Sequence, residues 1–349
     1  MSTKWRQVGL TISGSCLLEL PSVFGVLSDF MKRALIFGVS GQDGAYLAKL
    51  LLEKGYEVHG TSRDHEIATF ANLESLGIRD EVHLRSMMCS EFRSVLTTLQ
   101  GVAADEIYNL SGQSSVALSF TYPVETFESI SVGTINILEC LRLLKHPARF
   151  YNAGSSEVLG NTDEPATEIT PFHPRSPYAT AKAAAHYSVV NYREAYGLYA
   201  CNGILFNHES PLRPARFVTR KIVAAAVRIA NGSGERLKLG NLTGQRDWGW
   251  APEYVDAMWR MMQQPEPADY VVATGETHSL RDLVAAVFSR LGFDWREYVD
   301  EDASLLRPSD IKVSAANPAK SAEALGWTAE KKMKDVVDAL VEAEGQRQL

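Results

Sequence analysis

Short apolar runs alternate with stretches of helical periodicity along most of the chain. Six runs have the length and composition of buried strands, and four stretches repeat their apolar residues at the spacing of an amphipathic helix. We predict strands at residues 33–37, 57–61, 81–84, 106–110, 149–153 and 201–206, and helices at residues 45–54, 92–100, 134–144 and 178–196. Regular alternation of strand and helix predicts an α/β fold with a doubly wound parallel sheet.

The pattern becomes irregular after residue 206. Proline, glycine and polar residues are mixed there among segments that indicate only short helices. Such a region fits a smaller cap at the carboxyl ends of the strands, where open α/β sheets bind their ligands. We therefore predict a nucleotide-binding domain over residues 31–206. Residues 207–349 would form mainly a substrate-binding cap, with segments that return to the first domain.

The first thirty residues differ from the rest of the chain. Residues 1–6 are polar and basic, residues 8–18 are largely apolar, and Glu19, Pro21 and Asp29 place polar residues or proline in the remainder. No run of about 20 apolar residues is available to span a membrane. A secretory signal is the alternative, but no small-x-small cleavage site precedes the first predicted strand. We predict a poorly ordered extension, residues 1–30, that neither folding nor activity requires.

A glycine turn, Gly38-Val-Ser-Gly-Gln-Asp-Gly44, links the first strand to the first helix. Gly38 would allow the tight bend, Gly41 the close approach of a pyrophosphate, and Gly44 the close packing of the helix, whose N-terminal amides attract phosphate. The three-residue spacing departs from Gly-x-Gly-x-x-Gly, but the order of strand, turn and helix supplies the context that such a pattern needs. The turn predicts a Rossmann-like fold that binds a dinucleotide.

The end of the second strand indicates which dinucleotide is bound. Thr61-Ser62-Arg63 stands where an acidic residue would bind a ribose 2′-hydroxyl. An arginine suits a 2′-phosphate instead, so we predict NADP as the cofactor. The alternative is an exposed arginine that pairs locally with Asp64.

Composition is that of a globular enzyme. The chain has 349 residues, 45% hydrophobic and 22% charged, with a formal net charge of −7, which does not indicate a surface for nucleic acid. Its four cysteines, Cys16, Cys89, Cys140 and Cys201, are scattered without the spacing of a zinc site or a disulfide framework. We expect free thiols, no metal and a cytoplasmic location.

Tyr178 and Lys182 are the first candidates for catalysis. A tyrosine with a pKa of about 10 is a poor base at neutral pH, and an ammonium one helical turn away would lower that pKa. Ser155 and Glu157, at the end of a predicted strand, add a hydroxyl and a carboxylate. The alternatives are an ordinary solvated helix pair, a strand-end cap at Ser155 and a carboxylate at Glu157 that satisfies helix amides.

Six segments carry a resemblance to a known family. They are Gly38-Val-Ser-Gly-Gln-Asp-Gly44, Tyr108-Asn-Leu-Ser-Gly-Gln-Ser-Ser115, Phe172-His-Pro-Arg-Ser-Pro-Tyr178, Asn202-Gly-Ile-Leu-Phe-Asn-His-Glu-Ser210, Phe217-Val-Thr-Arg-Lys-Ile222 and Arg246-Asp-Trp-Gly249. Together they resemble the GDP-mannose 4,6-dehydratases, which are extended short-chain dehydrogenases/reductases. The resemblance runs through nearly everything after residue 31.

The resemblance implies a role for each catalytic candidate. Tyr178, helped by Lys182, would take the proton of the mannose 4-hydroxyl, and Ser155 would hydrogen-bond the 4-oxygen. Glu157 would remove the C5 proton and help the 6-hydroxyl leave as water. GDP-D-mannose would become GDP-4-keto-6-deoxy-D-mannose through an internal redox cycle of NADP, without net consumption of the cofactor.

The resemblance also implies the binding residues. Cofactor contacts are expected from Gly38, Gly41, Gln42, Asp43, Gly44, Arg63, Leu110, Ser111, Gln113, Ser114, Tyr122, Lys182, His208 and Arg213. Contacts with the GDP-sugar are expected from Ser114, Asn207, Lys221, Arg246 and Arg307. A homo-oligomer is expected as well. Asp64-His65-Glu66 replaces a loop that in the family reaches a neighbouring subunit, so a dimer and a tetramer both stay open.

Other functions stay open beside the dehydratase. A GDP-heptose 4,6-dehydratase would share every catalytic residue, and a reductase or epimerase of GDP-sugars would share the fold. A non-catalytic dinucleotide sensor usually lacks the tyrosine and lysine pair. Reduction and epimerisation do not need an acid two residues after the hydroxyl, so Glu157 is the residue that favours dehydration.

Overall fold

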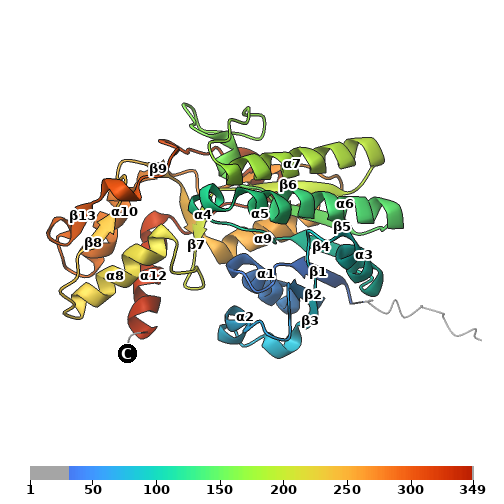
Figure 1. Ribbon diagram of the computed structural model, residues 1–349, viewed down its shortest axis with the longest axis horizontal. Coiled ribbons are helices and arrows are strands. Elements are labelled where there is room, and N and C mark those ends of the chain that lie inside the picture. Colours follow the sequence, from blue (N-terminus) through green and yellow to red (C-terminus); the bar gives the residue numbers. More distant parts are fainter. Residues whose placement is uncertain (1–30, 348–349) are drawn as a thin grey trace, which may run out of the picture. The chain divides into compact units, whose positions relative to one another are not determined.

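Seven parallel strands form the central sheet of the computed structural model, which describes residues 31–347 (Figure 1). Their order is β3-β2-β1-β4-β5-β6-β11. The strands are β1 (Arg33–Phe37), β2 (Glu57–Ser62), β3 (His83–Ser86), β4 (Glu106–Asn109), β5 (Arg149–Ala153), β6 (Ala200–Leu205) and β11 (Tyr270–Val272). Strands are added toward one edge from β1 to β3 and toward the other edge from β4 onward. The boundary between β1 and β4 is therefore the topological switch point, where doubly wound sheets bind ligands. The predicted fold class is confirmed.

Alternate residues of each strand face two separate cores. Ala34 and Ile36 of β1 pack with the helices of one layer, whereas Leu35 and Phe37 pack with those of the other. Both faces of the sheet are therefore covered, which explains the nearly continuous apolar runs in the sequence.

Two helical layers cover the sheet (Figure 1). One layer contains α1 (Gln42–Glu53) and α9 (Ala251–Met262), with α2 (Ala71–Ser75) and α11 (Ala319–Leu325) at its margins. The other contains α3 (Phe92–Gly101), α6 (Gly133–Leu144) and α7 (Pro177–Tyr196). The short helices α4 (Val116–Thr121) and α5 (Pro123–Phe127) and a π-helical turn, Glu128–Val132, lead into α6.

The second half of the chain supplies a separate core. Its elements are α8 (Val218–Ala230), β8 (Leu237–Leu239), α10 (Leu280–Arg290), β13 (Val299–Glu301) and α12 (Met333–Arg347). Two short strand pairs lie beside it, β7 (Asn207–Glu209) with β10 (Trp248–Trp250) and β9 (Gln245–Arg246) with β12 (His278–Ser279).

The prediction of only short helices after residue 206 is wrong, because α8 and α12 have 13 and 15 residues. The domain boundaries stay a prediction, although β11 and α9 do return to the sheet and its helical layer.

Two further predictions concern the chain ends and membranes. The predicted extension, residues 1–30, lies outside the described residues. Within residues 31–347 no helix is long and apolar enough to cross a bilayer.

A ladder of buried side-chain amides crosses three neighbouring strands. Asn109 of β4 lies opposite Asn152 of β5, which lies opposite Asn202 of β6. Asn109 Nδ2 donates to Asn152 Oδ1 at 3.1 Å, Asn152 Nδ2 donates to Asn202 Oδ1 at 2.9 Å, and Asn202 Nδ2 donates to Asp269 Oδ1 at 3.1 Å. At the other end, Ser111 Oγ donates to Asn109 Oδ1 at 2.6 Å. The amide ladder thus connects the loop after β4 to Asp269, which directly precedes the edge strand β11.

Candidate active site

A cavity of about 1170 Å³ is lined by the segments that follow β1, β2, β4 and β5 and by the loops that lead into the second core. Every site residue predicted from the sequence lines it except Tyr122. Tyr122, between α4 and α5, has 52% of its surface exposed. Its role as a cofactor contact stays a prediction that the geometry does not support.

The glycine turn is built as a phosphate-binding turn should be. Gly38 has φ +87°, and a Cβ there would lie 2.9 Å from Leu110 O. A Cβ on Gly44 would lie 2.7 Å from Val39 Cα, so α1 could not pack this closely with any other residue. Gly41 has only an ordinary contact at 3.4 Å and caps α1 without a side-chain hydrogen bond. Its own N–H donates to Gly38 O at 3.1 Å, but Gly41 lines the cavity without a side chain, so a pyrophosphate can approach the backbone at the start of α1.

The end of β2 fits a 2′-phosphate. Asp64 is not the partner of Arg63, because its Oδ1 accepts from the backbone N–H groups of Glu66 and Ile67. Within residues 31–347 Arg63 has no carboxylate partner, and the buried Ser62 hydroxyl has no hydrogen-bond partner. Ser62 and Arg63 are consecutive in sequence and both line the cavity, where an anionic ligand would supply the partner that each lacks.

His208 joins the glycine turn to β7. Its Nε2 lies 2.9 Å from Asp43 Oδ2 and its Nδ1 lies 2.7 Å from Phe206 O. A backbone carbonyl and a carboxylate are both acceptors, so this pair of contacts favours the doubly protonated form of the His208 ring. Burial lowers the pKa of His208, but the charge and hydrogen bond of Asp43 outweigh it and raise that pKa. Burial likewise raises the pKa of Asp43, and His208 outweighs this and brings the pKa to about 2.

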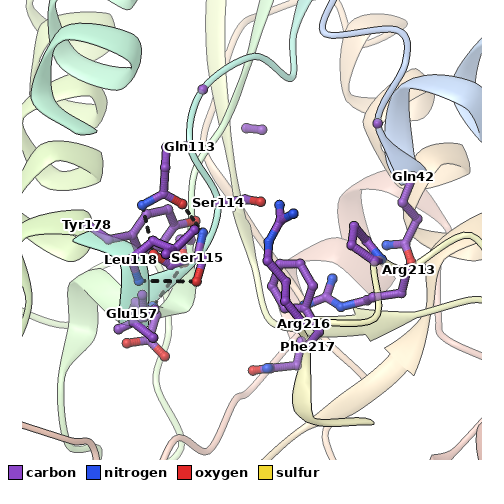
Figure 2. A pocket seen from close by; sticks show the side chains of 18 of the residues that line it. Gln42, Gln113, Ser114, Ser115, Leu118, Glu157, Tyr178, Arg213, Arg216 and Phe217 are labelled. Carbon is purple, nitrogen blue, oxygen red and sulfur yellow. Dashed lines mark hydrogen bonds between the residues drawn. The ribbon is translucent and has the colours of Figure 1, made fainter. Parts of the chain in front are cut away.

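Gln42, the first residue of α1, and Gln113, in the loop after β4, both hydrogen-bond neighbouring segments of the cavity wall. Gln42 Oε1 accepts from Ser210 Oγ at 2.8 Å, and Gln113 Nε2 donates to Ser115 O at 2.8 Å. Figure 2 shows Gln113 and Ser115 on the same wall of the cavity as Tyr178, with Gln42 and Arg213 on the opposite wall. Ser114 lies between the two walls (Figure 2) and lines the cavity, so either ligand could reach it.

The catalytic candidates lie together at the carboxyl end of β5. Ser155 Oγ accepts from Glu157 N at 3.3 Å and caps a 3₁₀ turn, Ser156–Leu159. Its hydroxyl also interacts with Tyr178 and lowers the pKa of that phenol. Ser155 therefore caps this turn and also lines the cavity, so the two interpretations of Ser155 are compatible.

The expected effect of Lys182 on Tyr178 is wrong for the chain alone. Burial raises the pKa of Tyr178 to about 12, although the Ser155 hydrogen bond and the Arg213 charge lower it. Lys182 lies 5.9 Å from the centre of the Tyr178 ring and donates to Ala153 O at 2.7 Å. Burial lowers the pKa of Lys182 to about 8, so Lys182 loses its proton more readily than a solvated lysine does. Desolvation of both groups outweighs their mutual attraction.

Glu157 faces the cations of the second core. Burial raises the pKa of Glu157, while the charges of Arg246 and Arg307 lower it. Both arginines are held by Asp310, at 3.1 Å and 3.4 Å from its Oδ1. A carboxyl with a raised pKa is a stronger base, once ionised, than a solvated carboxyl.

Other residues of the site escaped the sequence analysis. Glu209, with 2% of its side chain exposed, pairs with Arg213 at 3.0 Å and accepts a hydrogen bond from Thr219 Oγ1. It thereby fixes the start of α8, from which Lys221 reaches Lys238 O at 2.7 Å. Asp310 and Arg216 also line the cavity. Glu209 and Thr219 lie inside the quoted motifs, which could have identified them.

Comparison with known proteins agrees with this geometry. The family model described as GDP-mannose 4,6 dehydratase matches residues 35–340. "GDP-mannose 4,6 dehydratase 1" of Arabidopsis thaliana is 45% identical over 306 residues, which cover 85% of each chain. "GDP-mannose 4,6-dehydratase" of Sinorhizobium fredii is 44% identical over 337 residues, 89% of this chain and 95% of that protein.

Solved structures share the fold at lower identity. A UDP-glucose 4-epimerase of Thermotoga maritima has a TM-score of 0.81 at 19% identity, covering 91% of this chain and all of that one. A dTDP-glucose 4,6-dehydratase of Streptomyces venezuelae also has a TM-score of 0.81, at 21% identity, covering 90% and 98%. These solved structures show the fold alone, whereas the family model and the close relatives show the family. The chain belongs to the GDP-mannose 4,6-dehydratase family.

Proposed function

We propose that the protein converts GDP-D-mannose to GDP-4-keto-6-deoxy-D-mannose with loss of one water. The observation that carries this proposal is the position of Glu157, a carboxyl with a raised pKa in the same cavity as Ser155, Tyr178 and Lys182. Oxidation or epimerisation at C4 needs only the last three. Elimination of water needs an additional group that removes the proton at C5.

The cavity fits NADP. Its pyrophosphate would lie at the N-terminus of α1, beside Gly41, and its 2′-phosphate would bind at Ser62 and Arg63. When bound, NADP supplies the oxidation at C4 and the matching reduction at C6, so no net redox change occurs.

The chain's own residues move the protons. Tyr178 Oη would take the proton of the 4-hydroxyl, with Ser155 as its hydrogen-bond partner. A ketone at C4 acidifies C5, and Glu157 would carry that proton from C5 to the departing 6-hydroxyl. Arg246 and Arg307 would neutralise the diphosphate of the GDP group, although both share Asp310 in the absence of substrate. Asn207 and Lys221 line the same region and would contact the nucleotide.

A GDP-heptose 4,6-dehydratase is the second candidate, since it would use every residue named above. The decisive experiment is incubation of the purified protein with GDP-mannose, with mass spectrometry of the nucleotide sugar. We expect loss of one water and no net change in NADPH absorbance. Unchanged GDP-mannose, together with water loss from a GDP-heptose, would favour the second candidate. Net oxidation or reduction of the cofactor would indicate a reductase.

Arg63→Ala should weaken NADP binding far more than NAD binding. Only NADP loses a charge-assisted contact, worth about 1.5 to 3 kcal/mol or roughly 10- to 100-fold in Kd. Calorimetric titration of both dinucleotides measures the difference, with Arg85→Ala, an exposed arginine on β3, as the control. An equal loss for both dinucleotides would mean that Arg63 does not bind the 2′-phosphate.

We also propose that the enzyme is a cytoplasmic homo-oligomer. Several large apolar side chains of this region are exposed: Val132, just before α6, Ile135 and Leu143 of α6, and Tyr187 and Tyr196 of α7. These two helices pack side by side, and an exposed apolar surface of this kind suits a second copy of the chain. Within residues 31–347 the three cysteines are free thiols, which supports a reducing compartment.

A further inference from the structure

Seven lysine and arginine side chains line the cavity, and five of them have an acceptor. Lys182 and Lys221 donate to backbone carbonyls, Arg213 pairs with Glu209, and Arg246 and Arg307 share Asp310. In the described part of the chain, Arg63 and Arg216 have none. The proposed 2′-phosphate contact explains why Arg63 has no acceptor. No ligand has yet been assigned to Arg216.

Arg216 occupies a central place in the cavity. It lies in the loop between β7 and α8, and its side chain is exposed to the cavity rather than folded against an acidic neighbour. Figure 2 shows it between the wall that carries Tyr178 and Glu157 and the wall that carries Gln42 and Arg213.

Phe217 holds Arg216 beside a second arginine. The guanidinium carbon of Arg213 lies 4.0 Å from the centre of the Phe217 ring, and that of Arg216 lies 5.2 Å from it. Glu209 balances the charge of Arg213, but nothing in residues 31–347 balances that of Arg216. Two cations held on one ring leave an excess positive charge, which an anion from outside the chain would neutralise.

We propose that Arg216 is a diphosphate-binding residue of this cavity. A planar, forked guanidinium matches phosphate oxygens in a bidentate manner, and the Phe217 ring lowers the entropy cost of holding it in place. This inference rests on the proposed function for the identity of the ligands, both of which contain a diphosphate. One source is the pyrophosphate of NADP, near Gln42 and the start of α1. The other is the diphosphate of the GDP-sugar.

Binding measurements on the full chain test the proposal without turnover. NADP is titrated into the protein, and GDP is then titrated into the NADP-saturated protein, for wild type and R216Q. We expect R216Q to raise the Kd of one ligand by roughly 10- to 100-fold, and R216K, which keeps the charge but loses the fork, to raise it less. A loss for NADP assigns Arg216 to the cofactor pyrophosphate, and a loss for GDP alone assigns it to the sugar nucleotide.

The matched control is R79Q. Arg79 also lies over a phenylalanine ring, 5.0 Å from the centre of Phe70, but it does not line the cavity. R79Q should therefore leave both Kd values unchanged. The proposal is overturned if R216Q binds both ligands as wild type does, or if R79Q weakens them as much. Wild-type protein that binds neither ligand would overturn the proposed function as well.

Discussion

Glu157→Gln should lower the rate of water loss by roughly 10²- to 10⁴-fold, the usual cost of removing a general base. The amide has nearly the shape of the carboxyl, but it cannot take the proton from C5. Oxidation at C4 does not depend on Glu157, so it should survive. In deuterated water, we therefore expect wild-type product to carry deuterium introduced during turnover, and the variant to form little product at all.

A neighbouring carboxylate gives the control for this result. Glu164 is exposed and does not line the cavity, so Glu164→Gln should turn over GDP-mannose at the wild-type rate. Near-normal dehydration by Glu157→Gln would remove the main reason for proposing a dehydratase.

Tyr178→Phe should lower kcat by a similar factor of about 10²- to 10⁴-fold, since it removes the only oxygen proposed to take the proton of the 4-hydroxyl. The ring packs with Ile130, Ala181 and Ala185, so the variant should keep its fold. Circular dichroism and the kcat for GDP-mannose measure the two effects separately. Tyr187→Phe, an exposed tyrosine on the same helix, is the control.

The pH profile adds a second test of Tyr178. A base must be unprotonated, and burial holds the pKa of this phenol at about 12. The ionised fraction therefore increases as the pH rises, and the wild-type rate should rise between pH 6 and pH 8. A wild-type rate that falls between pH 6 and pH 8 would contradict the assignment of Tyr178 as the base.

The sequence predicted the sheet better than the cap. β1 and β5 begin and end at the predicted residues, because each is a short apolar run between polar or glycine residues. α1 begins three residues earlier than predicted, because Gln42, Asp43 and Gly44, the last residues of the glycine turn, already belong to the helix. β11 was not predicted: it has three residues, and its pairing with β6 is a long-range contact that no local pattern records. The amphipathic pattern of α8 was present in the sequence, but the surrounding prolines and glycines obscured it.

Motifs predicted which residues line the cavity, but not their charge balance. The pairing of Glu209 with Arg213, and of Asp310 with two arginines, depends on segments that meet only in the fold. The same holds for Tyr178 and Lys182: their spacing correctly predicted a shared pocket, yet burial decides their pKa values. Arg216 lies between two recognised motifs, and only its lack of an acceptor in the described residues distinguishes it from a surface arginine.

The hydrogen bonds of the amide ladder all run in one direction across the sheet. Asp269 is bound by Arg193 through both carboxylate oxygens, so it can only accept hydrogen bonds. Asn202 must then point its NH₂ group toward Asp269, and Asn152 and Asn109 must follow in the same sense. The hydroxyl proton of Ser111 is consequently committed to Asn109, so Ser111 Oγ can only accept, and Cys89 Sγ, 3.0 Å away, must be the donor in that pair. The ion pair between Asp269 and Arg193 thus determines that the Ser111 hydroxyl, on the wall of the cavity, acts as an acceptor and not as a donor.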